Sequence, residues 1–455
     1  MRATKKQIAV ITVLNLVIAA LIALFVYFKT PLFRSASSET DDGAGGGNNG
    51  TITDGDGTTN VDTPPQQSVH NKLRDAASGK VKEIAYETRL MGTGDESVVF
   101  ATAIGGVTYI FGNAVVPDYD FDSSGGFLCR IGSNGKILGF SYFIGKLTAV
   151  GVIDGGFGAA TVADAGTEDE KSQLFGVTGD GEITPLFELE GAAVDVMPIM
   201  GSKKMAVVCR ISSGTLKLTE YTRAGTGWAV GKSTRMSNGL SIEYFDCYYV
   251  DGEYIVSARA SSGAEYDTLL FYTFAAGGEP TSHYPGGSDE KPYAVVPFGS
   301  GYLALCEKEG NAAIVTFGKK FTSYSRDRLD VKSTDGRLFF CGGKYYACFV
   351  TKSGAVTYEI DGSLDMTKTL TKLDGVGLAA VVSMDSNLFV GASSTAVTVT
   401  DCAEISATLD VNDVKISRVI KTGYNELLIV LTAKGGGALS DSTGGDDVYV
   451  ISVKL

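Results

Sequence analysis

An internal repeat constrains the fold of this chain more than any other feature of its sequence. From about residue 80 to the C-terminus, a unit of four apolar segments separated by turns recurs at intervals of roughly 47 residues. One such unit cannot bury its apolar faces alone and must stack against its neighbours. The period therefore predicts a series of similar small sheets that pack side by side.

The repeat is most regular at its tight turns, which are rich in glycine. Glycine accounts for 58 of the 455 residues, and two-residue hairpins require small residues that adopt positive φ. An apolar run with β-branched and aromatic residues follows each turn at once, which predicts a strand. The turns between the first and second segments fall at Gly105-Gly106, Gly155-Gly156, Gly201-Ser202, Asp251-Gly252, Ser300-Gly301, Gly342-Gly343, Asp385-Ser386 and Thr422-Gly423.

The eighth unit contains only three segments, the last of them Val448–Val453. The run Val81–Leu90 precedes the first unit and has no hairpin partner of its own. Pairing between these two runs would supply the missing fourth strand and close the ring with an N-terminal strand. The sequence therefore predicts an all-β, eight-bladed β-propeller over residues 80–455. Seven blades are the alternative if one unit is misread.

This arrangement of turns resembles the β-propeller class, and the resemblance covers the whole repeat region. It matches no named family by motif. The Gly-His and Trp-Asp pairs of WD40 repeats are missing, and the single tryptophan, Trp228, is incompatible with one Trp per blade. The resemblance therefore implies a divergent propeller architecture and carries no functional residues, because one fold serves many functions.

An apolar segment near the N-terminus predicts a membrane anchor. Residues 8–28 contain no charged side chain and are long enough to cross a hydrocarbon core of ~30 Å as a helix. Basic residues in the tail 1–7 favour a cytoplasmic N-terminus. A cleaved signal peptide is the alternative. Residues 29–79 are polar and glycine-rich and predict a flexible linker. The propeller is then extracytoplasmic, displayed on the cytoplasmic membrane by a single pass.

The charge and the scarcity of histidine limit the functional classes. The chain has 39 basic and 52 acidic side chains, a net charge of −13, which disfavours nucleic acid as a partner. It has only two histidines, His70 and His283, and no Ser–His–Asp pattern. We therefore expect no catalytic residues and no cofactor. A pair of carboxylates from different blades, as in a glycosidase, stays open.

The seven cysteines form no CxxC pair, which disfavours a metal or redox site. Several occupy equivalent segment positions, where we expect them to pack as small apolar side chains. Cys341 and Cys348 flank the Gly342-Gly343 turn, and a disulfide between them is the alternative. The cysteines are Cys129, Cys209, Cys247, Cys306, Cys341, Cys348 and Cys402.

The longest loops between second and third segments are acidic and belong to the first, second and eighth units. These units are neighbours once the ring closes, so the sequence predicts one acidic binding sector for a cationic partner surface or for Ca²⁺. Ordinary solvated loops are the alternative. The residues of this sector are Asp118, Asp120, Asp122, Asp164, Glu168, Asp169, Glu170, Asp441, Asp446 and Asp447.

The calcium hypothesis rests on Asp118, Asp120 and Asp122, which have the one-three-five spacing of a calcium loop. The segment departs from the EF-hand pattern because Ser123 replaces the glycine at position six and Cys129 replaces the glutamate at position twelve. A second local feature is a group of tyrosines in and around the fourth unit, for which strand packing is the simpler explanation and an interface the alternative.

Taken together, these features favour a non-enzymatic role as a protein-binding or scaffolding module of the cell envelope, with another envelope or membrane protein as partner. Two alternatives stay open. One is binding of, or action on, an envelope glycan. The other is a sensory ectodomain that works with a partner in the membrane.

Overall fold

The computed structural model describes most of the repeat region and almost none of the chain before it. The predicted tail, membrane segment and most of the predicted linker lie outside the described residues. Within the described residues, no helix is long and apolar enough to cross a membrane. The described residues are 77–79, 83–90, 95–115, 124–163, 170–263, 267–285, 290–321, 324–352, 354–360, 366–368, 377–383, 387–393, 396–400, 406–409, 414–423, 425–434 and 445–455.

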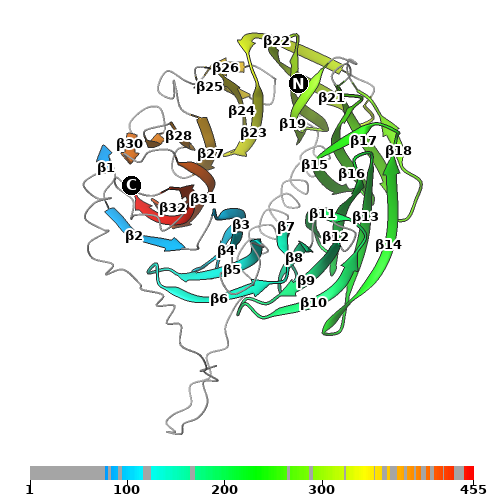
Figure 1. Cartoon of the computed structure of the whole chain (residues 1–455). Helices are drawn as coiled ribbons and strands as arrows, with labels where there is room; N and C mark the ends of the chain where they lie inside the picture. Colours follow the sequence, from blue (N-terminus) through cyan, green and yellow to red (C-terminus); the bar gives the residue numbers. More distant parts are fainter. Residues whose placement is uncertain are drawn as a thin grey trace, which may run out of the picture. The chain divides into compact units, whose positions relative to one another are not determined.

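Eight antiparallel sheets form the blades of a β-propeller (Figure 1). The sheets follow one another along the chain in the order of the eight predicted units, and the first strand of each unit lies nearest the centre of the ring. The prediction of an eight-bladed propeller is confirmed, and the seven-blade alternative is wrong. We number the blades 1 to 8 in chain order.

The first four blades each consist of four strands that are consecutive in sequence. Blade 1 contains β3 (Ser97–Ile104), β4 (Val107–Val115), β5 (Ser124–Gly132) and β6 (Ile137–Phe143); blade 2 contains β7 (Lys146–Ile153), β8 (Gly156–Ala163), β9 (Lys171–Val177) and β10 (Ile183–Leu189); blade 3 contains β11 (Ala192–Ile199), β12 (Lys204–Ser212), β13 (Thr215–Ala224) and β14 (Gly227–Ser237); blade 4 contains β15 (Ser241–Val250), β16 (Glu253–Ser261), β17 (Asp267–Ala275) and β18 (Thr281–His283).

Blades 5 to 7 repeat this pattern, and blade 8 contributes three strands of its own. Blade 5 contains β19 (Lys291–Phe298), β20 (Gly301–Lys308), β21 (Asn311–Gly318) and β22 (Tyr324–Lys332); blade 6 contains β23 (Asp335–Cys341), β24 (Lys344–Thr351), β25 (Gly354–Ile360) and β26 (Met366–Lys368); blade 7 contains β27 (Gly377–Ser383), β28 (Asn387–Ala392), β29 (Val397–Thr400) and β30 (Ser406–Leu409); blade 8 contains β31 (Lys415–Gly423), β32 (Glu426–Ala433) and β33 (Asp447–Lys454).

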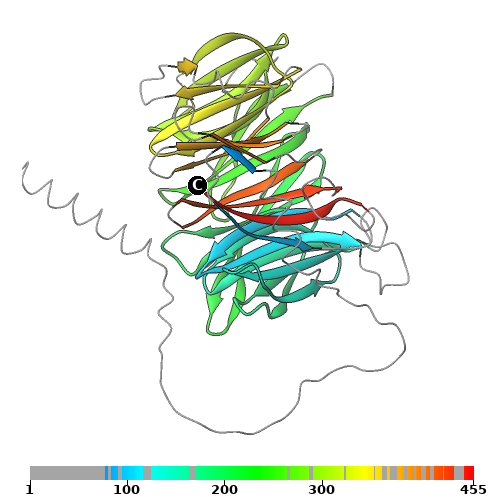
Figure 2. The same cartoon turned by 90° about the vertical axis from the view of Figure 1, so that its left-hand side faces the viewer.

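Two strands from the N-terminal side of the repeats join the last two blades. β2 (Glu83–Leu90) pairs antiparallel with β33 as the outer strand of blade 8. In Figure 2 the blue β2 lies beside the red C-terminal strand. β1 (Ala77–Gly79) pairs with β30 and adds a fifth strand to blade 7. These three residues fall within the range assigned to the linker, so that range contains a strand that the sequence pattern did not predict.

The hydrophobic core lies between blades, where the faces of neighbouring sheets meet. One cluster joins blade 8 to blade 1 through residues such as Leu428, Val450, Ile110 and Phe127, and equivalent clusters join six of the other seven pairs of neighbouring blades. Middle strands are therefore buried on both faces, and β32 is buried along nearly its whole length. This explains why the second segments of the repeats are continuous apolar runs rather than alternating ones.

The six cysteines among the described residues are all buried, and none is part of a disulfide. The register of β23 and β24 places Cys341 opposite Lys344 and Cys348 opposite Arg337. The alternative of a disulfide between Cys341 and Cys348 is therefore wrong for this structure, because the two thiols are not cross-strand partners. Cys402 lies outside the described residues.

The innermost strands are irregular in a repeated way that the sequence did not predict. In six blades the pairing of the first and second strands shifts by one residue near the start of the inner strand. Such bulges bend a strand and increase its twist. The residues skipped in the register are Thr148, Val194, Phe245, Tyr293, Ala379 and Ser417.

A buried amide connects blade 1 to blade 2. Asn113 Nδ2 donates to Leu147 O at 3.0 Å, and Leu147 N donates to Asn113 Oδ1 at 2.7 Å. Both residues are buried, so neither backbone group of Leu147 can turn to water.

We expect Asn113→Ala to destabilise the fold by about 2 kcal/mol, because it leaves a buried donor and a buried acceptor without partners. The measurement is the free energy of unfolding by urea denaturation. Thr184→Ala, at an exposed position of β10, is the control and should change stability by less than about 0.5 kcal/mol. Equal stability of the two variants would contradict the role of this amide.

Candidate functional site

The predicted acidic sector belongs to one end of the propeller, which we call the long-loop face. This end carries the connections between the second and third strands of each blade and the connections from one blade to the next. Of the ten predicted residues, Glu170, Asp446 and Asp447 are among the described residues. The others, including the calcium candidates Asp118, Asp120 and Asp122, lie outside them, so the sector and its calcium site stay predictions.

The three described residues differ in exposure. Glu170 is exposed just before β9, and Asp446 is partly exposed. Asp447, in contrast, is completely buried at the first position of β33. Its Oδ2 lies 2.8 Å from Nε of Arg89 on β2, whose side chain is 9% exposed. The structure thus corrects the assignment of Asp447 to an exposed binding surface, because this carboxylate is used inside blade 8.

A second buried carboxyl, Glu96, lies beside this ion pair at the junction of blades 8 and 1. Burial raises the pKa of Glu96 to about 9, and a hydrogen bond to Asp447 and the negative charges of Asp447 and Asp95 act in the same direction. Arg89 opposes them. At neutral pH Glu96 is therefore protonated beside the ion pair of Arg89 and Asp447.

Backbone hydrogen bonds hold this junction together. Glu96 N donates to Asp446 O at 2.7 Å, and Asp446 N donates to Asp95 Oδ1 at 3.0 Å. The start of β33 in blade 8 therefore lies against the segment that precedes β3 in blade 1. Among the described residues, no group of three or more His, Cys, Asp or Glu side chains has the arrangement of a metal site.

The tyrosines around blade 4 connect it to both neighbouring blades. The hydroxyl of Tyr244 on β15 donates to Asp195 on β11 in blade 3. Tyr254 Oη donates to Glu220 Oε1 in blade 3 at 2.7 Å, and Tyr248 Oη donates to Val295 O in blade 5 at 3.1 Å. The packing explanation of the tyrosine cluster is thus the better one for these three residues.

Two carboxyls on innermost strands bear on the glycosidase alternative. Burial raises the pKa of both Asp195 on β11 and Asp246 on β15, and the charge of Asp246 raises the pKa of Asp195 further. However, each carboxyl interacts with a neighbouring tyrosine, Asp195 with Tyr244 and Asp246 with Tyr248. Their positions are therefore accounted for by the packing of blades 3 to 5.

A group of exposed apolar side chains lies elsewhere, on and just after the outer strand of blade 1. Along β6, the alternate residues Leu138, Phe140 and Tyr142 are 50%, 40% and 60% exposed, and Ile144 in the next connection is 72% exposed. The rings of Phe140 and Tyr142 stack with centroids 6.3 Å apart. We call these four residues the β6 stripe. Contiguous exposed apolar side chains of this kind mark interaction surfaces.

The other outer strands carry features that discourage pairing with a further strand. β10 contains Pro185, β14 exposes Lys232 and Arg235, and β22 exposes Arg328. β18 and β26 are only three residues long, and β1 covers β30. β6 is the last strand in the order of its sheet and has no charged residue or proline. The β6 stripe was not predicted from the sequence, although the alternation of apolar residues in this fourth segment was a readable signal.

The raised pKa of Glu96 gives a stability that depends on pH. Its pKa is about 9 in the folded state against an ordinary value of 4.5. Its contribution to stability is therefore complete below about pH 4.5 and is lost progressively as the pH rises to about 9. Glu96→Gln is neutral at every pH. We expect this variant to unfold at least about 3 °C higher than the wild type at pH 8 and to show a flatter profile between pH 5 and 9.

Glu188→Gln is the matched control, because Glu188 is an exposed glutamate on β10. It should leave the profile of unfolding temperature against pH unchanged to within about 1 °C. A wild-type profile that does not decline above pH 5, or a lower unfolding temperature for Glu96→Gln at pH 8, would show that Glu96 is charged in the folded protein.

Comparison with known proteins finds similarity among solved structures. No family model and no curated protein matches this chain. Among solved structures, it is similar to BamB from Moraxella catarrhalis (12% identity, TM-score 0.47, covering 80% of this chain and 100% of that one) and to the Dos1 propeller (12% identity, TM-score 0.47, 80% and 94%). It is also similar to the β-propeller domain of the Trilobed protease from Pyrococcus furiosus (10% identity, TM-score 0.46, 70% and 99%). The eight blades, together with the lack of a matching family model, make this chain a divergent β-propeller.

Proposed function

We propose that this protein is an extracytoplasmic scaffold of the cell envelope, anchored to the cytoplasmic membrane by residues 8–28 with its N-terminus inside. Its propeller binds another envelope or membrane protein and catalyses no reaction. The linker gives the propeller reach from the membrane. β2 acts as the N-terminal strand that closes the ring, which is supported by its seven-residue register with β33.

The observation that carries this proposal is the β6 stripe. The partner we propose supplies an extended segment that adds to β6 as a fifth strand of blade 1. Backbone hydrogen bonds provide the affinity in such a complex, and alternate side chains provide the specificity. Leu138, Phe140 and Tyr142 present the apolar side of this strand pairing. Because the chain is strongly acidic, we expect basic residues to flank the apolar part of the partner segment.

Site-specific crosslinking in native membranes tests this function. With Tyr142→p-benzoylphenylalanine we expect one reproducible protein adduct, identified by mass spectrometry. The same probe at Val230, which is 58% exposed on β14, is the control and should not give that adduct. Recovery of the probe in a glycan fraction instead of a protein adduct would favour the glycan alternative. An adduct with a signalling membrane protein would favour the sensory alternative.

A single charge on β6 should weaken binding strongly. We expect Phe140→Lys to weaken the complex at least about 30-fold, because it places an ammonium group in the centre of an apolar strand pairing and repels basic flanks. Val230→Lys is the matched control. The measurement is the yield of the crosslinked adduct together with the unfolding temperature, which should stay within about 2 °C of the wild type for both variants. Equal yields for the two variants would refute the role of β6.

The acidic sector of the long-loop face is a second, separate contact surface in this proposal, and its cofactor is Ca²⁺ bound by Asp118, Asp120 and Asp122. We expect millimolar Ca²⁺ to raise the unfolding temperature, because binding adds RT ln(1 + [L]/Kd) to the free energy of unfolding, which is about 2.7 kcal/mol at one hundred times Kd. Asp120→Asn should remove the shift. An unchanged unfolding temperature in Ca²⁺ would leave the sector as a surface for a cationic partner only.

A further inference from the structure

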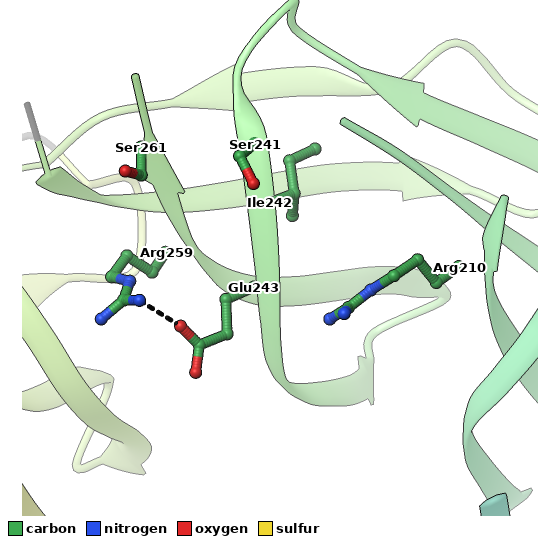
Figure 3. Close-up of a pocket in the computed structure, with 6 residues that line it drawn as sticks. All are labelled: Arg210, Ser241, Ile242, Glu243, Arg259 and Ser261. Atoms are coloured by element: carbon green, nitrogen blue, oxygen red, sulfur yellow. Dashed lines mark ion pairs between the residues drawn. The ribbon is translucent and has the colours of Figure 1, made fainter. Parts of the chain in front are cut away.

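A polar pocket opens between blades 3 and 4 at the long-loop face (Figure 3). Its volume is ≈ 370 Å³, which is near the lower end of the range for small-molecule sites. Arg210 comes from β12 in blade 3, whereas the other residues come from the paired strands β15 and β16 in blade 4. The lining residues are Arg210, Ser241, Ile242, Glu243, Arg259 and Ser261.

The floor and the far wall of the pocket are fixed by blade 4. Ile242 is buried, and its backbone N–H donates to Ser213 O of blade 3 at 2.6 Å, which holds the two blades together at this point. Ser241 lies opposite Ser261, and Glu243 lies opposite Arg259, in the register of β15 and β16. The polar groups are therefore on regular strands, and the site needs no loop to assemble.

The two arginines of the pocket differ in their ion pairs. Nη2 of Arg259 lies 2.6 Å from Oε2 of Glu243, and its Nε lies 3.7 Å from Oδ1 of Asp267. Arg259 is thus shared by two carboxylates. Arg210 is exposed and forms no ion pair with any residue that the structure describes. In Figure 3 its guanidinium points toward Glu243 from the side opposite to Arg259.

We propose that this pocket binds a small carboxylic acid that also carries hydroxyl or amino donors. The carboxylate of the ligand binds Arg210, whose planar guanidinium can donate two parallel hydrogen bonds. The donors of the ligand bind Glu243, whose remaining acceptor sites face the pocket beside Arg210. The hydroxyl of Ser241 completes the polar lining. A sugar acid and an α-amino acid share this chemistry.

The arrangement favours such a ligand over a simple anion or a neutral sugar. Glu243 repels a carboxylate that brings no donor, and a neutral polyol leaves Arg210 unused. A ligand carboxylate that binds Arg210 displaces water and no protein partner. No existing ion pair therefore has to break before the new one forms. The pocket also differs in chemistry from the β6 stripe on blade 1, and its ligand is independent of the proposed protein partner.

Isothermal titration calorimetry on the full chain in detergent micelles tests the inference with four probes. These are glucuronate, alanine, acetate and glucose. We expect glucuronate or alanine to bind with a dissociation constant at least about tenfold lower than acetate and glucose, and the preference between the first two identifies the source of the ligand. The proposal would be overturned if acetate or glucose bound as tightly as both glucuronate and alanine. It would also be overturned if no probe showed saturable binding up to about 10 mM.

Variants assign the binding to this pocket. Arg210→Gln should weaken binding of the preferred acid at least about tenfold, and Arg210→Lys should give an intermediate loss because it keeps the charge and not the paired donors. Glu243→Gln should reduce the advantage of that acid over acetate. Arg337→Gln, at an exposed arginine on β23, is the matched control and should bind as the wild type does. Undiminished binding to correctly folded Arg210→Gln would refute the site.

Discussion

The packing of apolar sheet faces between neighbouring blades is the interaction on which the rest of this structure depends. Each blade buries both faces of its middle strands, and the side chains buried between blades include large ones such as Phe111, Phe157 and Phe271. A single four-stranded sheet of this composition would expose those faces to water. Eight of them are stable because each sheet covers the next around the ring, including blade 8 against blade 1.

Polar contacts within these apolar junctions determine how the blades align. The Asn113 amide fixes blade 2 against blade 1, and the hydroxyls of Tyr248 and Tyr254 fix blade 4 between its neighbours. Buried groups of this kind are tolerated only when paired, so they specify one arrangement where apolar contacts alone would permit several. At the junction of blades 8 and 1, the alignment is determined by Arg89, Asp447 and protonated Glu96.

The ring leaves its outer strands and its two ends available for function. On most blades the outer strand is short, charged, covered or interrupted by proline, and β6 is the exception. The pocket at Arg210 and Glu243 arises at the long-loop face, where the ends of two blades diverge. Two surfaces with different chemistry thus lie on one rigid scaffold, an apolar strand on blade 1 and a polar pocket between blades 3 and 4.

The sequence by itself determined the repeat, the eight units, their strands and most of their tight turns, because hairpin turns and apolar runs are local properties of the chain. It also indicated that Val81–Leu90 and Val448–Val453 are partners, since each lacked a local one. It placed Asp447 in an exposed loop, because nothing local shows that Arg89, far away in sequence, lies beside it.

Only the tertiary structure decided which side chains face a neighbouring blade and which face water. The inner-strand bulges, the burial of Glu96, the exposure of the β6 stripe and the meeting of Arg210 with Glu243 all depend on contacts between units. A period of two assigns residues to the two faces of a strand but does not say what covers each face. What covers a face depends on the distance between adjacent blades, which are closest together at the centre of the ring and farthest apart at its rim.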